Sequence, residues 1–264
     1  YSWSPENPRL LYVDFTLYKG GKRVDLAHTR IGMRKISVDE HGKICLNNRP
    51  YYQRLVLDQG YWQESGLTPP SAEALRKDIE LAKAMGFNGA RKHQKLEDPY
   101  FCYYAEELGF LTWCEMPSAY RFCAEEVAAI TQEWQEIVRA GRNCTSNVSY
   151  VPLNESWGAR EIATDERQKA FARSLYYLTK SLDPTRLIST NDGFETVNPT
   201  DILGVHDYDS EKAEDFQKYA NGYDGMHPQG FALFAEGEKY EGQPALLTEF
   251  GGRAMQSDAK GEAW

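Results

Sequence analysis

The chain of 264 residues carries 30 basic and 39 acidic side chains, for a formal net charge of −9, and 41% of its residues are hydrophobic. This composition predicts a globular protein with a well-buried core. The negative charge, without any run of Lys and Arg, disfavours nucleic acid as a partner. No stretch approaches the roughly 20 apolar residues that a membrane span needs, so no membrane partner is predicted. The first residues show no export-signal pattern, which leaves cytoplasmic, periplasmic and secreted locations in a bacterium open.

The cysteines predict neither a zinc cage nor a dense disulfide framework. They are odd in number and contain no Cys-x-x-Cys pair, so we expect reduced thiols with structural roles. The five are Cys45, Cys102, Cys114, Cys123 and Cys144.

The first 40 residues predict a β-hairpin. Residues 10–18 (LLYVDFTLY) are rich in strand-forming residues, KGGK offers a glycine turn, and residues 23–38 form a second extended segment. Two strands alone are marginal in water. We therefore expect residues 1–40 to be the last strands of a larger β-sandwich.

From residue 51 onward, short apolar runs alternate with amphipathic segments, which is typical of βαβ units around a parallel sheet. Ser71 offers an N-cap for the first helix and Gly86 a C-terminal stop. The expected helices span residues 71–85, 98–108, 125–140 and 165–181. The expected strands span residues 51–57, 87–91, 110–115, 147–153, 186–190, 201–206 and 244–249.

This succession predicts a (β/α)8 TIM barrel over residues 41–264. The strands number seven rather than eight, so we expect the barrel to be incomplete at its C-terminus. An open barrel would leave its first and seventh strands with unpaired edges.

Active sites of such barrels lie at the carboxyl ends of the strands, so polar residues that directly follow a strand are candidates. One edge of the sheet should collect several acids, two histidines, an arginine and several aromatic residues. The candidates are Asp58, Gln59, Arg91, Lys92, His93, Gln94, Glu115, Asn154, Glu155, Asn191, Asp192, His206, Asp207, Tyr208, Asp209 and Glu249.

Two of these acids suggest a chemistry. Glu155 follows the fourth strand and Glu249 ends the seventh, and long side chains from these strands should converge across the barrel mouth. Glycosidic cleavage needs one carboxyl group to protonate the leaving oxygen and another to attack the anomeric carbon, about 5 to 5.5 Å apart in a retaining enzyme. Alone, either residue could be an ordinary solvated or strand-ending acid.

Five segments together resemble glycoside hydrolase family 2, which includes β-galactosidases, β-glucuronidases and β-mannosidases. They are NESWG, LLTEFGG, the run of residues 90–117, WSPENPRLLY and IGMRKISV. The resemblance extends from about residue 3 to residue 253. It implies that residues 1–40 are the C-terminal strands of an immunoglobulin-like sandwich before the catalytic barrel.

The resemblance also implies residue roles. Glu155 is expected to be the general acid/base, with its pKa raised by a dry setting, and Glu249 the nucleophile that stays charged. Asn154 would bind the sugar 2-hydroxyl, while Arg91 and Tyr208 would contact the nucleophile. Further expected pocket residues are His93, Asp58, Glu115, Trp157 and Trp62, the two tryptophans as sugar-stacking platforms.

The chain departs from the family after Arg91. Many relatives read Arg-x-Ser-His there, whereas this chain has its histidine at position 93, one residue earlier. The loop of residues 57–66 also differs. These departures leave the sugar open.

The sequence thus predicts a retaining, exo-acting glycoside hydrolase that cleaves a terminal β-linked sugar, with a β-galactoside or β-glucuronide favoured. A carbohydrate substrate is the expected partner, no cofactor or metal is expected, and a homo-oligomer stays open. A metal-dependent hydrolase using His206 and Asp207 is disfavoured because the spacings of metal-binding motifs are missing. The alternative is a non-catalytic carbohydrate-binding or structural fragment of such an enzyme.

Overall fold

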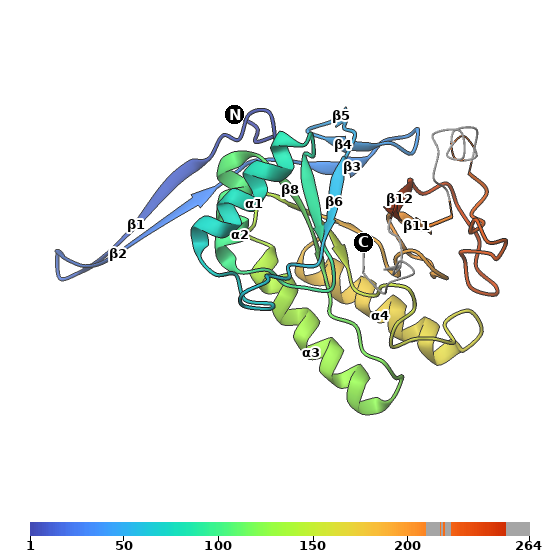
Figure 1. Ribbon diagram of the computed structural model, residues 1–264. Coiled ribbons are helices and arrows are strands. Elements are labelled where there is room, and N and C mark those ends of the chain that lie inside the picture. Colours follow the sequence, from blue (N-terminus) through green and yellow to red (C-terminus); the bar gives the residue numbers. More distant parts are fainter. Residues whose placement is uncertain (210–216, 218, 220–222, 252–264) are drawn as a thin grey trace.

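A five-stranded parallel sheet forms the centre of the molecule in the computed structural model, which describes residues 1–209, 217, 219 and 223–251 (Figure 1). Its strand order is β10-β9-β8-β7-β6, so strands that follow one another in sequence are also neighbours in space. The strands are β6 (Leu55–Asp58), β7 (Gly89–Lys92), β8 (Leu111–Glu115), β9 (Asn147–Val151) and β10 (Leu187–Ile188).

Two further parallel strands, β11 (Leu203–Asp207) and β12 (Ala245–Phe250), form a second ladder. All seven predicted strands are therefore confirmed. Among the described residues, β6 pairs only with β7 and β12 only with β11, so closure of a (β/α)8 barrel stays a prediction. A cavity of about 1130 Å³ lies between these two edges, lined by Leu55 and Leu57 of β6 and Leu247 and Phe250 of β12.

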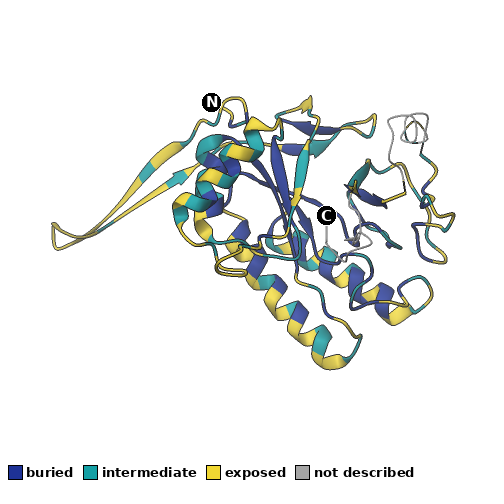
Figure 2. Ribbon diagram, viewed as in Figure 1, coloured by how far each residue is buried: buried dark blue, intermediate teal, exposed yellow. Residues whose placement is uncertain are grey.

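In the described part of the chain, four helices cover the sheet, and they overlap the four ranges that the sequence predicts. They are α1 (Ala72–Ala84), α2 (Pro99–Leu108), α3 (Ala124–Gly141) and α4 (Glu166–Leu182). Side chains of Ser71, Asp98 and Asp165 accept hydrogen bonds from backbone N–H groups of the first turns of α1, α2 and α4. Figure 2 shows each helix buried toward the sheet and exposed on its outer face.

The apolar faces of the helices form two cores against the sheet. Leu75 and Ile79 of α1 pack with Phe101 of α2, while Trp134 of α3 and Leu175 of α4 pack with the outer side of β9. Both Trp134 and Leu175 are fully buried. These cores hold the strands, and thus the strand ends that carry the candidate side chains, in fixed positions.

A small antiparallel sheet of β3 (Ile36–Val38), β4 (Ile44–Leu46) and β5 (Arg49–Pro50) precedes the parallel sheet. Its Ile36 and Ile44 share a core with Trp3 and with Leu111 and Trp113 of β8. Trp113 also donates a hydrogen bond from its indole N–H to the Gln53 side chain, 2.8 Å away.

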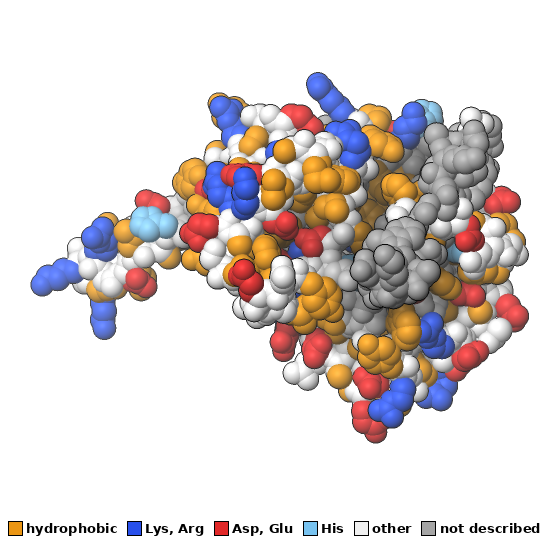
Figure 3. All heavy atoms as spheres, in the orientation of Figure 1, with side chains coloured by type: hydrophobic (Ala, Val, Ile, Leu, Met, Phe, Trp, Pro, Cys, Tyr) orange, Lys and Arg blue, Asp and Glu red, His pale blue; other side chains and the backbone are white. Residues whose placement is uncertain are grey.

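The predicted hairpin is confirmed as β1 (Leu11–Lys19) and β2 (Lys22–Ile31), which pair antiparallel. It projects as an arm from the rest of the molecule (Figure 1), and Figure 3 shows Lys and Arg side chains at its tip. Its large side chains Tyr12, Phe15 and Leu17 are exposed. Its assignment to an immunoglobulin-like sandwich domain stays a prediction.

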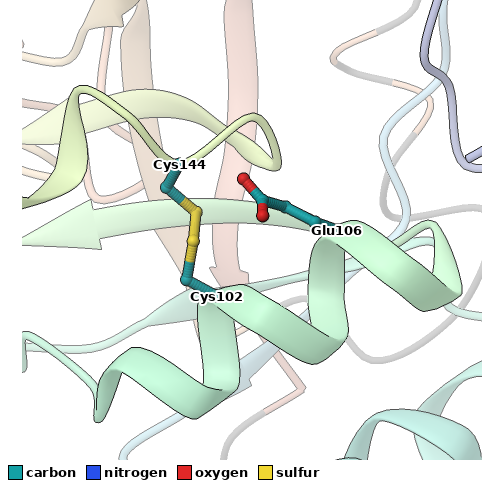
Figure 4. Close-up of side chains that lie close together, drawn as sticks. All are labelled: Cys102, Glu106 and Cys144. Atoms are coloured by element: carbon teal, nitrogen blue, oxygen red, sulfur yellow. A yellow bond between two sulfur atoms is a disulfide. The ribbon is translucent and has the colours of Figure 1, made fainter. Parts of the chain in front are cut away.

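The expectation of reduced cysteines is wrong for one pair. Cys102 of α2 and Cys144, before β9, form a disulfide with a Cα–Cα distance of 6.0 Å (Figure 4). They lie 42 positions apart in sequence, and the packing of α2 against that loop brings them together. The neighbouring Glu106 accepts a hydrogen bond from the Thr145 N–H and pairs with Arg30 at the base of the arm.

No described helix is long and apolar enough to span a membrane.

The core makes a first prediction. Leu175→Ala should lower the free energy of unfolding by about 2 to 5 kcal/mol, because it leaves a cavity between α4 and the sheet. Tyr177→Ala on the same helix removes an exposed side chain and should change it by less than about 0.5 kcal/mol. Urea unfolding followed by circular dichroism measures both. Equal losses in the two variants would contradict the assigned packing.

Candidate active site

The predicted candidates converge where the parallel strands end. Arg91 lies on β7, Glu115 ends β8, and Glu249 lies on β12, while Asn154 and Glu155 follow β9. All but Glu155 are buried, and the Glu155 side chain is 23% exposed. The arrangement therefore presents one partly open acid beside a closed polar cluster.

The Arg91 guanidinium, 2% exposed, lies at the centre of this cluster. Its Nε donates to Glu115 at 2.7 Å, and its Nη2 donates to the Asn154 side-chain oxygen at 2.7 Å. Its Nη1 lies 2.8 Å from Asp192 and 2.9 Å from Glu249. One buried cation thus orients three carboxylates and an amide. Their hydrogen bonds offset the free-energy cost of burying the guanidinium charge.

Glu249 is held by two donors. Besides Arg91, the Tyr208 hydroxyl donates to the other carboxylate oxygen. Burial, together with this bond and the charge of Glu249, raises the Tyr208 pKa, so the phenol keeps its proton and acts as a donor. These two donors fix the position of the Glu249 carboxyl group.

Glu155 sits on unusual backbone. Both Glu155 and Ser156 have left-handed φ angles, 49° and 55°. Hydrogen bonds hold this turn, from the Glu155 N–H to the Asp192 carbonyl and from the Ser156 N–H to the Asn191 side chain. Such conformations are costly for residues other than glycine and cluster at functional sites. The turn brings a Glu155 oxygen within 4.8 Å of a Glu249 oxygen.

The protonation of Glu155 differs from expectation. Burial alone would raise its pKa, but hydrogen bonds from His206 and Trp157 and the charge of His206 outweigh burial and lower the pKa. A raised pKa was expected because a dry setting was the only effect visible in the sequence. The structure shows an ion pair instead.

His206 of β11 is the partner in that ion pair, with its Nδ1 2.8 Å from a Glu155 oxygen. Its Nε2 lies 3.2 Å from Asp192 and 3.3 Å from Glu249. Burial opposes a charge on the 1% exposed imidazole, yet the bonds to Asp192 and Glu155 outweigh it and raise the His206 pKa to about 9. The imidazole is therefore positively charged at neutral pH.

The side chains of Glu155, His206 and Glu249 have donor atoms that could bind a metal ion. Both imidazole nitrogens already face carboxylates, and the Arg91 guanidinium bonds to Glu249. A metal ion would have to displace these bonds to reach the same atoms. We therefore interpret the cluster as an ion-pair network.

Two glycines make room for this network. A Cβ on Gly193 would lie 2.3 Å from the His206 ring, and a Cβ on Gly204 would lie 1.8 Å from the Asp192 carboxylate. Asp192 also accepts a hydrogen bond from Ser189 at 2.7 Å. The backbone is thus shaped around the imidazole and its carboxylate.

Two further predicted residues lie close to the network. His93, with 14% of its side chain exposed, has Nδ1 3.0 Å from Glu115 and 3.7 Å from Glu249. Trp157 contacts Glu155 through a side-chain hydrogen bond. The Arg160 guanidinium covers the Trp157 ring at 3.4 Å from its centroid, so one face already has a partner.

Asp58 and Trp62 are placed differently. Asp58 pairs with the buried Lys92 and accepts a hydrogen bond from the Gly60 N–H, which shapes the loop after β6. Trp62 packs against the core of α1 and α2. Their roles in sugar binding stay predictions.

Sequence reasoning placed Asp192 and His206 at strand ends but gave neither a role in acid–base chemistry. The segments NDG and HDYD directly follow apolar runs, and that position was the available signal. Spacing could not reveal that one imidazole would contact three carboxylates from different strands.

The chain resembles β-glucuronidases and β-galactosidases, although no family model matches it. A putative β-glucuronidase of Formosa agariphila is 24% identical over 97% of this chain and 32% of its own length. A β-galactosidase of Pseudoalteromonas haloplanktis is 26% identical over 76% of this chain and 19% of its own length. The chain thus spans a third or less of these curated relatives.

Solved structures share the fold. An FMN-binding β-glucuronidase from Facaelibacterium prausnitzii superposes with a TM-score of 0.72 at 22% identity, covering 84% of this chain and 36% of that one. Bacteroides uniformis β-glucuronidase 2, covalently bound to cyclophellitol-6-carboxylate aziridine, gives 0.64 at 21% identity, covering 88% and 28%. A glycosyl hydrolase family 2 member from Bacteroides cellulosilyticus gives 0.58 at 23%, covering 83% and 27%.

The space that Gly193 leaves beside the His206 ring leads to a second prediction. Gly193→Ala should destabilise the protein by clearly more than Gly230→Ala, because both have φ near +87° but only the first Cβ meets other atoms within 4 Å. The control, Gly230→Ala, should lower the free energy of unfolding by only about 1 to 2 kcal/mol, which is the strain of an alanine in a left-handed conformation. Thermal unfolding compares the two. Equal losses would show that the imidazole does not occupy this space.

Proposed function

We propose that the chain is a member of glycoside hydrolase family 2 and carries the catalytic centre of a retaining, exo-acting β-glycosidase. The observation that carries the proposal is the pairing of Glu155 with Glu249, whose nearest oxygens lie within 4.8 Å. Retaining enzymes hold their carboxyl groups about 5 to 5.5 Å apart, whereas inverting enzymes need about 6.5 to 9.5 Å to admit a water.

The environments of the two acids support separate roles. Glu249 is buried and fixed by Arg91 and Tyr208, which suits a nucleophile that attacks the anomeric carbon. Glu155 is more exposed and has a single strong partner in His206, which suits a group that exchanges a proton with the leaving oxygen and then with water. Asn154 directly precedes Glu155 and accepts a hydrogen bond from Arg91, and we propose that it binds the sugar 2-hydroxyl.

The substrate we propose is a terminal β-glucuronide or β-galactoside. The relatives named above are β-glucuronidases and β-galactosidases, and both activities use the same double displacement. We propose that His93, which lies beside Glu115 and Glu249, contacts a sugar hydroxyl. A carbohydrate is the only ligand the proposal requires.

A panel of chromogenic aryl β-glycosides tests the function. We expect turnover by the protein, and Glu249→Gln should lower kcat by about 10⁴-fold or more because the amide is not a nucleophile. Glu241→Gln, an exposed glutamate before β12, is the matched control and should retain activity. Sugar binding without turnover would instead favour a non-catalytic carbohydrate-binding or structural role.

Covalent labelling identifies the nucleophile and the sugar together. Cyclophellitol-6-carboxylate aziridine, the compound covalently bound in the Bacteroides uniformis structure, should attach to Glu249 if the sugar is a glucuronide. Intact-mass and peptide mass spectrometry should show the adduct, and Glu249→Gln should lack it. Labelling of another residue would contradict the assignment of the nucleophile.

The role of Glu155 gives a separate prediction. Glu155→Ala should slow alkyl glycosides by about 10² to 10⁴-fold, but slow aryl glycosides with good leaving groups much less, because these need little proton donation. Azide should restore the second step by attacking the glycosyl-enzyme. Steady-state kinetics across leaving groups measures the difference, and an equal loss on all of them would rule out this role.

A further inference from the structure

We propose that His206 is a positioning residue that stores the proton which Glu155 delivers to the leaving oxygen, with Asp192 holding the imidazole in place. The proposal rests on the glycosidase function proposed above. It adds a third member to the acid/base device and explains why Glu155 lies in an ion pair.

The contacts of the ring define its protonation. Nδ1 lies 2.8 Å from Glu155, and Nε2 lies 3.2 Å from Asp192. Carboxylate oxygens only accept hydrogen bonds, and a neutral imidazole has one N–H. With Glu155 and Asp192 both ionised, as their lowered pKa values indicate, only the imidazolium satisfies the two contacts together.

The groups that face His206 favour its positive charge. Glu155, Asp192 and Glu249 approach from three different segments, whereas among the described residues Arg91 is the one cation in contact, 3.4 Å from Nε2. The other titratable neighbours are the Tyr208 ring, 6.3 Å away, and the His227 side chain, which bonds to the His206 backbone. The pKa of about 9 follows from this balance.

The local backbone is built to hold the ring. A register shift in the β11–β12 ladder between Val205 and His206 sets His206 opposite Glu249. Gly193 leaves space for the ring, and Ser189 fixes the Asp192 carboxylate beneath Nε2. Bulges beside active sites commonly re-aim a side chain in this way.

The chemistry needs such a store. A general acid must carry a proton when the glycosidic bond breaks, yet the ion pair keeps Glu155 ionised. We infer that the Nδ1 proton passes to the Glu155 carboxylate, and the resulting neutral acid protonates the leaving oxygen. Meanwhile the anomeric carbon–oxygen bond breaks and Glu249 forms its bond to that carbon.

The second half of the reaction restores the starting state. Water attacks the anomeric carbon, its proton moves to Glu155 and then to His206 Nδ1, and the bond to Glu249 breaks. One proton leaves and one returns in each cycle, so no other reactant is needed. Asp192 stays ionised throughout, since burial is outweighed by the charge of Arg91 and the bond from His206, which lower its pKa.

Nuclear magnetic resonance of ¹⁵N-histidine-labelled protein tests the stored proton directly. The chain has five histidines, and His206→Gln identifies the resonance of interest. Both ring nitrogens of His206 should be protonated at pH 7 and lose a proton only near pH 9, while Asp192→Asn should move this titration to lower pH. A neutral His206 at pH 7 in the unaltered protein would overturn the proposal.

Kinetics tests the use of the proton. His206→Gln can still donate a hydrogen bond to Glu155 but holds no transferable proton. Its kcat/KM on alkyl glycosides should fall by about 10² to 10³-fold, with much smaller losses on activated aryl glycosides, and the alkaline limb of the pH profile should move to lower pH. His41→Gln, an exposed histidine, should leave the profile unchanged.

The outcomes separate the two proposals. If Glu249→Gln is inactive but His206→Gln keeps the original pH profile and leaving-group dependence, the proton store is wrong and the glycosidase function stands. If the unaltered protein turns over no β-glycoside while His206 is protonated at pH 7, the glycosidase function fails, and with it the transfer of that proton to a substrate.

Discussion

The buried guanidinium of Arg91 is the interaction on which the site depends. It contacts side chains from β8, from the segments after β9 and β10, and from β12, so it ties both parallel ladders together through charge-assisted hydrogen bonds. Lysine could not replace it, since a single ammonium group lacks the planar set of donors that reaches four oxygen-bearing groups. The two cores beneath the strands fix the backbone, but Arg91 fixes the side chains.

The two cations of the cluster give the two glutamates different partners. Four acids, Glu115, Glu155, Asp192 and Glu249, gather around Arg91 and the protonated His206. Two cations for four carboxylates leave the site negative, a field that suits an electron-poor, oxocarbenium-like transition state. Within this field, Glu249 forms an ion pair with the Arg91 guanidinium, and Glu155 forms one with the His206 imidazolium. The guanidinium never releases a proton and the imidazolium can, which fits the proposed roles of Glu249 as nucleophile and Glu155 as acid.

Periodicity and local chemistry predicted most of the fold. The N-cap at Ser71 was predicted because a short polar side chain caps exposed N–H groups, a signal that is local in sequence, and Asp98 and Asp165 cap α2 and α4 in the same way in the structure. Strand ends likewise identified Glu155 and Glu249. The disulfide between Cys102 and Cys144 and the packing of Trp62 into a helix core depend on contacts between distant segments. No spacing rule reports such contacts, and the pKa of Glu155 was misjudged for the same reason.

The register shift between β11 and β12 shows how a small backbone feature decides the chemistry. Val205 pairs with Leu247, but His206 pairs with Glu249, so one residue of β12 is skipped. Side chains alternate between the faces of a strand, and without the shift Glu249 would point away from the face that His206 occupies. The shift turns both toward Arg91 and Asp192. Since β12 has a ladder on one side only among the described residues, the bonds from Arg91 and Tyr208, rather than a second strand, hold Glu249 at its working position.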